Sequence, residues 1–108
     1  MSRSKAISMI SLGMRAGKVR GGEFASEEAV KNGKAFLLII AEDASANTKK
    51  KFENMCAWYE VPALTYGSKE SLGRAIGKDP RATLAVYDEG FAKAIAENIR
   101  SEQGSQKE

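Results

Sequence analysis

The hydrophobic pattern of the chain centres on one uninterrupted apolar run, residues 35–41, which Glu42 and Asp43 follow directly. Seven apolar residues without polar alternation are typical of a strand that is covered on both faces. Helices must therefore flank this strand on both sides. Its carboxyl end, at Glu42, is also the place where open α/β sheets commonly bind ligands.

The rest of the pattern predicts helices that alternate with shorter strands. Apolar residues recur at helical spacing in five segments, each preceded by a residue suited to begin a helix. These helices are expected after Ser4, near Gly22, and after Ser45, Ser68 and Asp88. Extended segments lie between them, at residues 17–22, 63–66 and 82–87. This alternation predicts an α/β fold, a three-layer α/β/α sandwich.

The third helix should place Phe52, Met55, Cys56 and Tyr59 against the sheet, because they follow helical spacing. Cys56 is then a core residue. Without a neighbouring base to activate it, this thiol is a poor candidate for a nucleophile. Trp58 lies outside the stripe, and the sequence leaves open whether it is half-buried or part of a contact surface.

The end of the chain changes in composition. From Arg100 onward it contains only Arg, Ser, Glu, Gln, Gly and Lys, which bury too little apolar surface to offset the entropy lost on ordering. We therefore expect a single α/β/α domain over residues 1–99 and a polar, disordered tail over residues 100–108.

Charge and composition narrow the classes of function. The net charge is +3, and residues 1–34 alone carry seven basic and three acidic side chains, which favours a polyanionic partner. The absence of histidine and the single cysteine exclude histidine-based triads, histidine-ligated zinc and an intrachain disulfide. We expect no metal and no cofactor. No segment reads as a membrane span or a signal peptide, so the expected location is the cytoplasm.

A glycine turn before the second helix is the first candidate site. Gly21 and Gly22 precede Glu23 and match neither the dinucleotide-binding fingerprint nor the P-loop. A glycine turn that enters a helix exposes backbone N–H groups, and with Lys18 and Arg20 nearby it suits a phosphate backbone. The alternative is a purely structural turn that needs positive φ.

Three further groups have both a functional and a structural interpretation. Lys78 and Arg81 bracket the loop before the last strand, and Lys49–Lys51 open the third helix. Each group either contacts a partner or is simply solvated. Glu42 and Asp43 have the residue types of a Mg²⁺ pocket in a phospho-receiver, but the chain lacks the early strand with further carboxylates that a receiver needs. A solvated strand end is the better interpretation of this acidic pair.

Three stretches follow one another in a distinctive order: A-E-D-A at 41–44, V-P at 61–62 and S-K-E-S-L-G-R-A-I-G at 68–77. Together they resemble the kink-turn-binding ribosomal protein superfamily, and the last string is the most specific. The resemblance covers residues 7–99 and is greatest to the YlxQ-type branch of bacterial, ribosome-associated proteins. It implies an α/β/α sandwich with a central mixed four-stranded sheet and no enzymatic activity.

The superfamily reads RNA with a G-x-N-E-x-x-K segment at the start of the second helix, where Asn and Glu pair with sheared G·A bases. With Gly22 as the anchor, Phe24 and Ala25 take the Asn and Glu positions, and Glu28 takes the Lys position. A frame that matches Glu23 to the Glu fits worse. The resemblance therefore supports the fold more strongly than kink-turn reading, and an aromatic residue at position 24 suits stacking on an unpaired base.

We therefore expect a monomeric, non-enzymatic protein whose main partner is ribosomal RNA or the ribosome. A ribosomal or translation-related protein is expected as a further partner. Basic side chains would neutralise phosphates, glycines would let the backbone approach, and glutamates would accept hydrogen bonds. The expected RNA-contacting residues are Lys18, Arg20, Gly21, Gly22, Glu23, Phe24, Glu28, Lys69, Lys78 and Arg81. The alternatives are a protein-interaction module on the same fold and a small α/β enzyme or receiver that uses Glu42 and Asp43.

Overall fold

The computed structural model describes residues 4–106 and contains one mixed sheet of four strands. Strands β1 and β2 both pair in antiparallel fashion with β4, and β2 also pairs in parallel fashion with β3. The order across the sheet is therefore β1-β4-β2-β3. The strands span Val19–Gly21 (β1), Leu37–Ile40 (β2), Ala63–Thr65 (β3) and Thr83–Val86 (β4).

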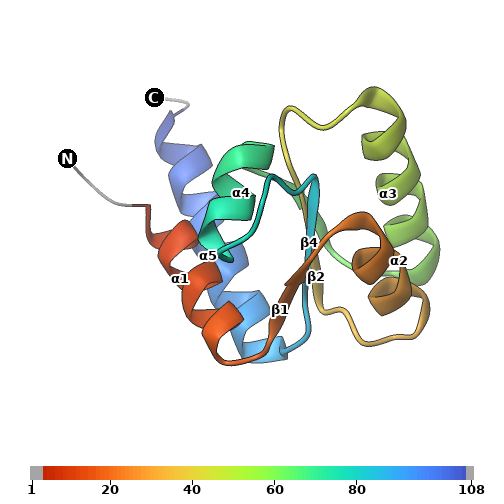
Figure 1. The fold of residues 1–108 in the computed structure, drawn as a ribbon, viewed down its shortest axis with the longest axis horizontal. Helices are drawn as coiled ribbons and strands as arrows, with labels where there is room; N and C mark the ends of the chain where they lie inside the picture. The colour runs from red at the N-terminus through yellow and green to blue at the C-terminus, as the bar shows by residue number, and fades with distance from the viewer. Residues whose placement is uncertain (1–3, 107–108) are drawn as a thin grey trace.

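Helices cover both faces of this sheet, and the predicted three-layer α/β/α sandwich is confirmed (Figure 1). One outer layer holds α1, α4 and α5, and the other holds α2 and α3. The helices span Lys5–Arg15 (α1), Glu23–Lys31 (α2), Ala46–Tyr59 (α3), Lys69–Ala75 (α4) and Glu89–Gln106 (α5). Within residues 4–106, none of these helices has the length and apolarity needed to cross a membrane.

The central apolar run forms β2, whose four residues are almost completely buried. The strand is shorter than the predicted run of residues 35–41. Phe36 lies before the strand and is exposed, and Ala41 follows the strand. Burial on both faces explains the lack of polar alternation. A buried hydrogen bond from Thr83 Oγ1 to Ser26 Oγ, 2.8 Å long, joins β4 to α2 within the same core.

The predicted helix starts are confirmed at their capping residues. Side-chain oxygens of Ser4, Ser45 and Ser68 each accept a hydrogen bond from the backbone N–H three residues later, which satisfies an otherwise unpaired donor. The predicted stripe on α3 is correct for Phe52 and Cys56, which are buried, but wrong for Tyr59. That side chain is exposed in the last turn of the helix.

The tail is more ordered than its composition predicts, because α5 continues to Gln106. The Glu102 carboxylate accepts hydrogen bonds from Tyr66 Oη (2.5 Å), Ser4 Oγ (2.9 Å) and the Ala6 amide (3.1 Å). Gln103 Nε2 donates to the Thr65 carbonyl at 2.8 Å. Helix α5 thus covers residues 100–106, where the composition favours disorder, and the polar contacts of Glu102 and Gln103 hold this part of the helix. Residues 107–108 lie outside the described part of the chain.

Candidate nucleic-acid interface

The sheet topology brings four loops to one edge. Since β1, β2 and β3 run in the same direction and β4 runs in the opposite one, the ends of the first three strands meet the start of β4. We call this the glycine-turn edge. It consists of the Gly21–Gly22 turn and the loops at residues 41–45, 66–68 and 77–82.

Backbone hydrogen bonds join these loops to one another. The Gly22 amide donates to the Thr83 carbonyl (3.0 Å), and the Arg81 amide donates to the Lys69 carbonyl (2.9 Å). The Lys69 amide donates in turn to Asp43 Oδ1 at 2.8 Å. The glycine turn, the acidic pair after β2 and the basic loop before β4 thus form one connected surface.

The glycine turn leaves backbone donors open at the start of α2. Gly22 has φ of +108° and caps the helix without a side chain. The first amides of a helix have no intrahelical acceptors, so those of Glu23, Phe24 and Ala25 point out of the helix end. A Cβ on Gly21 would lie 2.6 Å from Ile76 Cδ1 and 2.9 Å from Leu84 Cδ2, so a larger residue would require these side chains to shift. The result is a bare, electropositive helix end.

Two kinds of side chain lie on the glycine-turn edge together with this helix end. Phe24 is 81% exposed, which is unusual for a large apolar ring and leaves its face open to a ligand. Lys69 and Lys78 are exposed cations. Arg81 is half-buried, packs its aliphatic stem near Gly21, and donates from Nη1 to the Asp79 carbonyl at 3.0 Å. Arg81 therefore both shapes the loop and adds positive charge to it.

Three expected site residues lie elsewhere. Lys18 is at the opposite end of β1, where its carbonyl accepts from the Tyr87 amide at 2.7 Å. Arg20 places its guanidinium 5.7 Å from the Tyr87 ring and lines a shallow pocket together with Glu28 and Lys34. The structure therefore does not bring Lys18, Arg20 and Glu28 to the glycine-turn edge.

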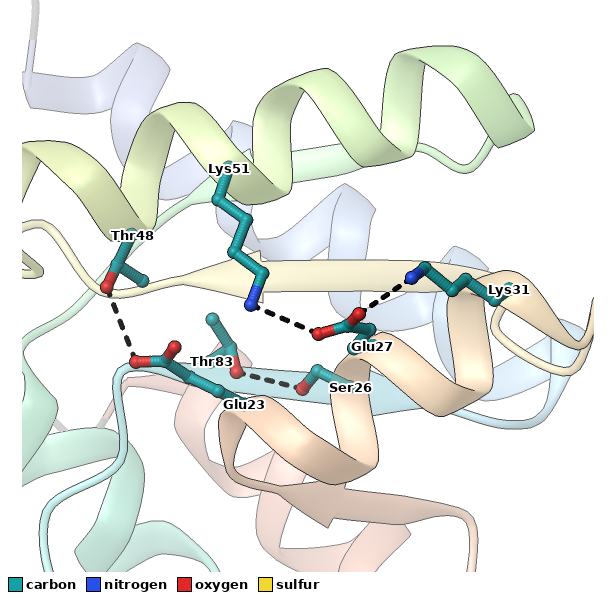
Figure 2. A network of polar contacts seen from close by, with 7 residues as sticks. All are labelled: Glu23, Ser26, Glu27, Lys31, Thr48, Lys51 and Thr83. Atoms are coloured by element: carbon teal, nitrogen blue, oxygen red, sulfur yellow. Dashed lines mark hydrogen bonds and ion pairs between the residues drawn. The ribbon is translucent and has the colours of Figure 1, made fainter.

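The joint between α2 and α3 adjoins the edge and is held by polar contacts (Figure 2). Thr48 Oγ1 donates to Glu23 Oε2 at 3.3 Å, which orients the first residue of α2. Further along, the Glu27 carboxylate pairs with Lys31 at 2.7 Å and with Lys51 at 3.1 Å. Hydrogen bonds from Lys31 and Lys51 hold the pKa of Glu27 below its ordinary value, and Glu27 in turn raises the pKa of Lys31.

Two residues with catalytic potential have structural roles instead. Asp43 uses a carboxylate oxygen to bind the first amide of α4. Burial raises the pKa of the Cys56 thiol to about 11, so this sulfur is protonated and unreactive at neutral pH. Sequence patterns do not predict the contact of Asp43, because it joins residues 26 positions apart. The helical pattern also leaves the burial of Trp58 open, and the structure shows this ring to be exposed.

Comparison with known proteins identifies relatives over nearly the whole chain. The "RNA-binding protein YlxQ" of Enterococcus faecium is 42% identical over 98 residues, which cover 91% of this chain and 94% of the relative. The protein of the same name from Bacillus subtilis (strain 168) is 40% identical over 95 residues, with coverage of 88% and 95%.

Solved structures share the fold. A protein with unknown function from Bacillus halodurans C superposes with a TM-score of 0.87 at 38% identity, covering 91% of this chain and 99% of that one. The Giardia lamblia 15.5kD RNA binding protein superposes with a TM-score of 0.73 at 22% identity, with coverage of 96% and 92%, and shows the common fold alone. The sequence model of one family matches residues 5–96, and on this match the chain belongs to the Ribosomal protein L7Ae/L30e/S12e/Gadd45 family.

Proposed function

We propose that this chain is a non-enzymatic, ribosome-associated protein that binds structured RNA through its glycine-turn edge. Membership of a ribosomal protein family and relatives named as RNA-binding proteins support the class of ligand. The observation that carries the proposal is the bare glycine turn with open α2 amides beside the exposed Phe24 ring. Such a turn accepts a phosphate, and the ring accepts a base.

Each residue at the edge has a distinct role in this proposal. The amides after Gly22 bind phosphate oxygens, while Lys69 and Lys78 neutralise neighbouring phosphates from the exposed surface. Arg81 holds the basic loop against the turn and presents its remaining donors. Glu23, oriented by Thr48, accepts hydrogen bonds from base donors.

The position of Glu28 determines whether its charge opposes kink-turn binding at this edge. Glu28, which stands at the Lys position of the superfamily segment when Gly22 is the anchor, lines the pocket of Arg20 instead of the edge. Its carboxylate therefore does not repel a phosphate at the glycine turn. We infer that the edge binds a kinked RNA chiefly by phosphate contacts and by stacking of Phe24, without the paired hydrogen bonds of an Asn side chain.

Filter binding of the full chain tests the proposal with an isolated kink-turn RNA, a ribosomal RNA fragment and an unkinked duplex of equal length. Each phosphate contact contributes about −0.7 to −0.9 to the slope of log K against log salt concentration. Replacing Lys69 and Lys78 together by alanine should therefore weaken binding and reduce the slope by about 1–2. The matched control is Lys18→Ala, at the other end of β1, which should leave the affinity and the salt slope nearly unchanged.

The outcomes separate the parts of the proposal. Absence of binding to all three RNAs, or binding that salt does not weaken, contradicts RNA recognition by this edge. Equal affinity for the kinked and the unkinked RNA contradicts kink-turn recognition alone. Ribosome association is tested by sedimentation of the tagged chain from a cell extract, where it should appear in the ribosomal fractions and leave them in high salt.

A further inference from the structure

One face of α3 carries a feature that the glycine-turn edge does not use. Asn47, Lys51, Asn54 and Trp58 recur at spacings of four, three and four residues, which places them in one row along the helix. Trp58 is 80% exposed and is the single tryptophan of the chain. An exposed indole on a row of lysine and amide side chains has the composition of a stacking platform.

The charge of the two outer helices differs on this side of the sheet. Helix α3 contains three lysines and one glutamate, whereas α2 contains three glutamates and one lysine. Within residues 4–106 Lys50 forms no ion pair, and Lys51 shares the carboxylate of Glu27 with Lys31. Glu53 points away from Trp58, roughly 140° around the helix. A polyanion is therefore favoured along α3 and disfavoured along α2.

The row is continuous with the glycine-turn edge. Helix α3 begins at that edge, and Thr48 in its first turn contacts Glu23 of α2 (Figure 2). Trp58 follows Thr48 by ten residues, about 15 Å along the helix axis. A few nucleotides of single strand span such a length, and binding sites of this kind commonly cover about 4–16 nucleotides.

We propose that a single-stranded RNA segment, continuous with the structured RNA at the glycine-turn edge, runs along α3 and stacks an unpaired base on Trp58. Lys50 and Lys51 neutralise its phosphates, and Asn54 offers hydrogen bonds to the sugar or base. The proposal rests on RNA binding at the glycine-turn edge. The composition of the row favours RNA over a protein partner, because lysine is depleted from protein interfaces whereas lysines beside an aromatic ring suit a single strand.

The single tryptophan makes the contact directly measurable. The probes are a kink-turn RNA alone and the same RNA with a single-stranded extension of about ten uridines at either its 5′ or its 3′ end. One extended RNA should bind more tightly than the blunt RNA and quench the fluorescence of Trp58. Trp58→Ala should lower affinity for that extended RNA about fivefold or more while leaving affinity for the blunt RNA unchanged.

Two variants make the result specific. Trp58→Phe keeps a stacking face and should retain most of the gain from the extension. Leu12→Ala removes a 46% exposed apolar side chain from α1, in the opposite layer. This variant should retain all of the gain in affinity from the extension. Circular dichroism of each variant checks that the fold is intact.

The failures of the two proposals are distinguishable. If the blunt RNA binds but neither extension raises affinity or quenches the tryptophan, the row along α3 is overturned and the glycine-turn edge stands. If Trp58→Ala leaves affinity for the extended RNA unchanged, the row along α3 is likewise overturned. If no RNA binds, both proposals fall together.

Discussion

At the scale of single residues, Gly73 decides how closely α4 approaches the basic loop. A Cβ at this position would lie 2.7 Å from the carbonyl carbon of Asp79 and 2.8 Å from Pro80 Cα. Both are backbone atoms, so a longer side chain cannot be accommodated by a rotamer change. Gly73 thus allows the loop with Lys78 and Arg81 to pack closely against α4. The Arg81 amide donates a hydrogen bond to the carbonyl of Lys69 in α4.

Gly73→Ala should therefore lower the free energy of unfolding by about 1–3 kcal/mol, because the loop must move away from α4. Chemical denaturation measures this change, and displacement of Lys78 and Arg81 should also weaken RNA binding. Gly104→Ala is the matched control, since no atom lies within 4 Å of its Cβ position. Alanine there should raise stability by up to about 1 kcal/mol, through helix propensity. Equal effects at both sites would contradict the steric argument.

At the scale of elements, the helices differ in which residue takes the left-handed conformation at their C-terminal ends. Helices α1 and α4 are each followed by one cap residue and then by a glycine with positive φ, Gly17 and Gly77 respectively. Helix α3 ends differently, at Glu60, whose φ of 60° is left-handed although it is not a glycine. The left-handed conformation costs a residue with a Cβ roughly 1–2 kcal/mol.

Glu60→Gly should therefore stabilise the protein by about 0.5–1 kcal/mol, after the greater chain entropy of glycine is subtracted. The midpoint and slope of urea unfolding give this difference. Asn32→Gly serves as the control, because Asn32 caps α2 with φ of −93° and gains nothing from glycine. A loss of stability at Glu60 would show that its side chain has a contact worth more than the strain.

At the scale of the whole molecule, one carboxylate joins the two ends of the described chain to the sheet. Glu102 in α5 accepts hydrogen bonds from Ser4 before α1 and from Tyr66 after β3. Burial alone would raise the pKa of Glu102, but these bonds and the Ala6 amide outweigh it and hold the pKa below the ordinary 4.5. Burial, together with the Glu102 charge, raises the pKa of Tyr66 to about 12.

A lowered carboxylate pKa means that the unfolded chain binds protons more readily than the folded one. The contribution of Glu102 is therefore complete above pH 4.5 and is lost as the pH falls through the lower folded-state value. Unfolding by urea at a series of pH values from about 6 to about 3 should show a decline that Glu102→Gln reduces. Some decline should persist in that variant, because Glu27 also has a lowered pKa. Parallel curves for the two proteins would contradict this role.

Much of the local structure could be predicted from the sequence. The buried strand β2 follows from an apolar run, and the starts of α1, α3 and α4 follow from Ser4, Ser45 and Ser68. These features depend on neighbours within a few residues, so a single sequence contains their cause. The glycine turn belongs to the same class, since Gly22 takes its positive φ one residue before α2.

The composition of the surface depends instead on contacts between distant segments. Lys18 and Arg20 are near the glycine turn in sequence, yet strand direction and alternation carry their side chains away from it. Lys69 and Arg81 lie far from the turn in sequence, yet a backbone hydrogen bond joins the two, and the stem of Arg81 packs near Gly21. Likewise Glu102 is ordered by partners 36 and 98 residues away, which no local composition reveals.

The sequence by itself determined the buried strand after which the chain turns to Glu42 and Asp43, the alternation of helices with strands, and the positions of the turns. These follow from side-chain hydrophobicity and backbone preference over short distances. Only the tertiary structure decided which loops share an edge, because insertion of β4 between β1 and β2 sets where each strand ends. It also decided that Trp58 is exposed, since burial depends on what the rest of the chain packs against.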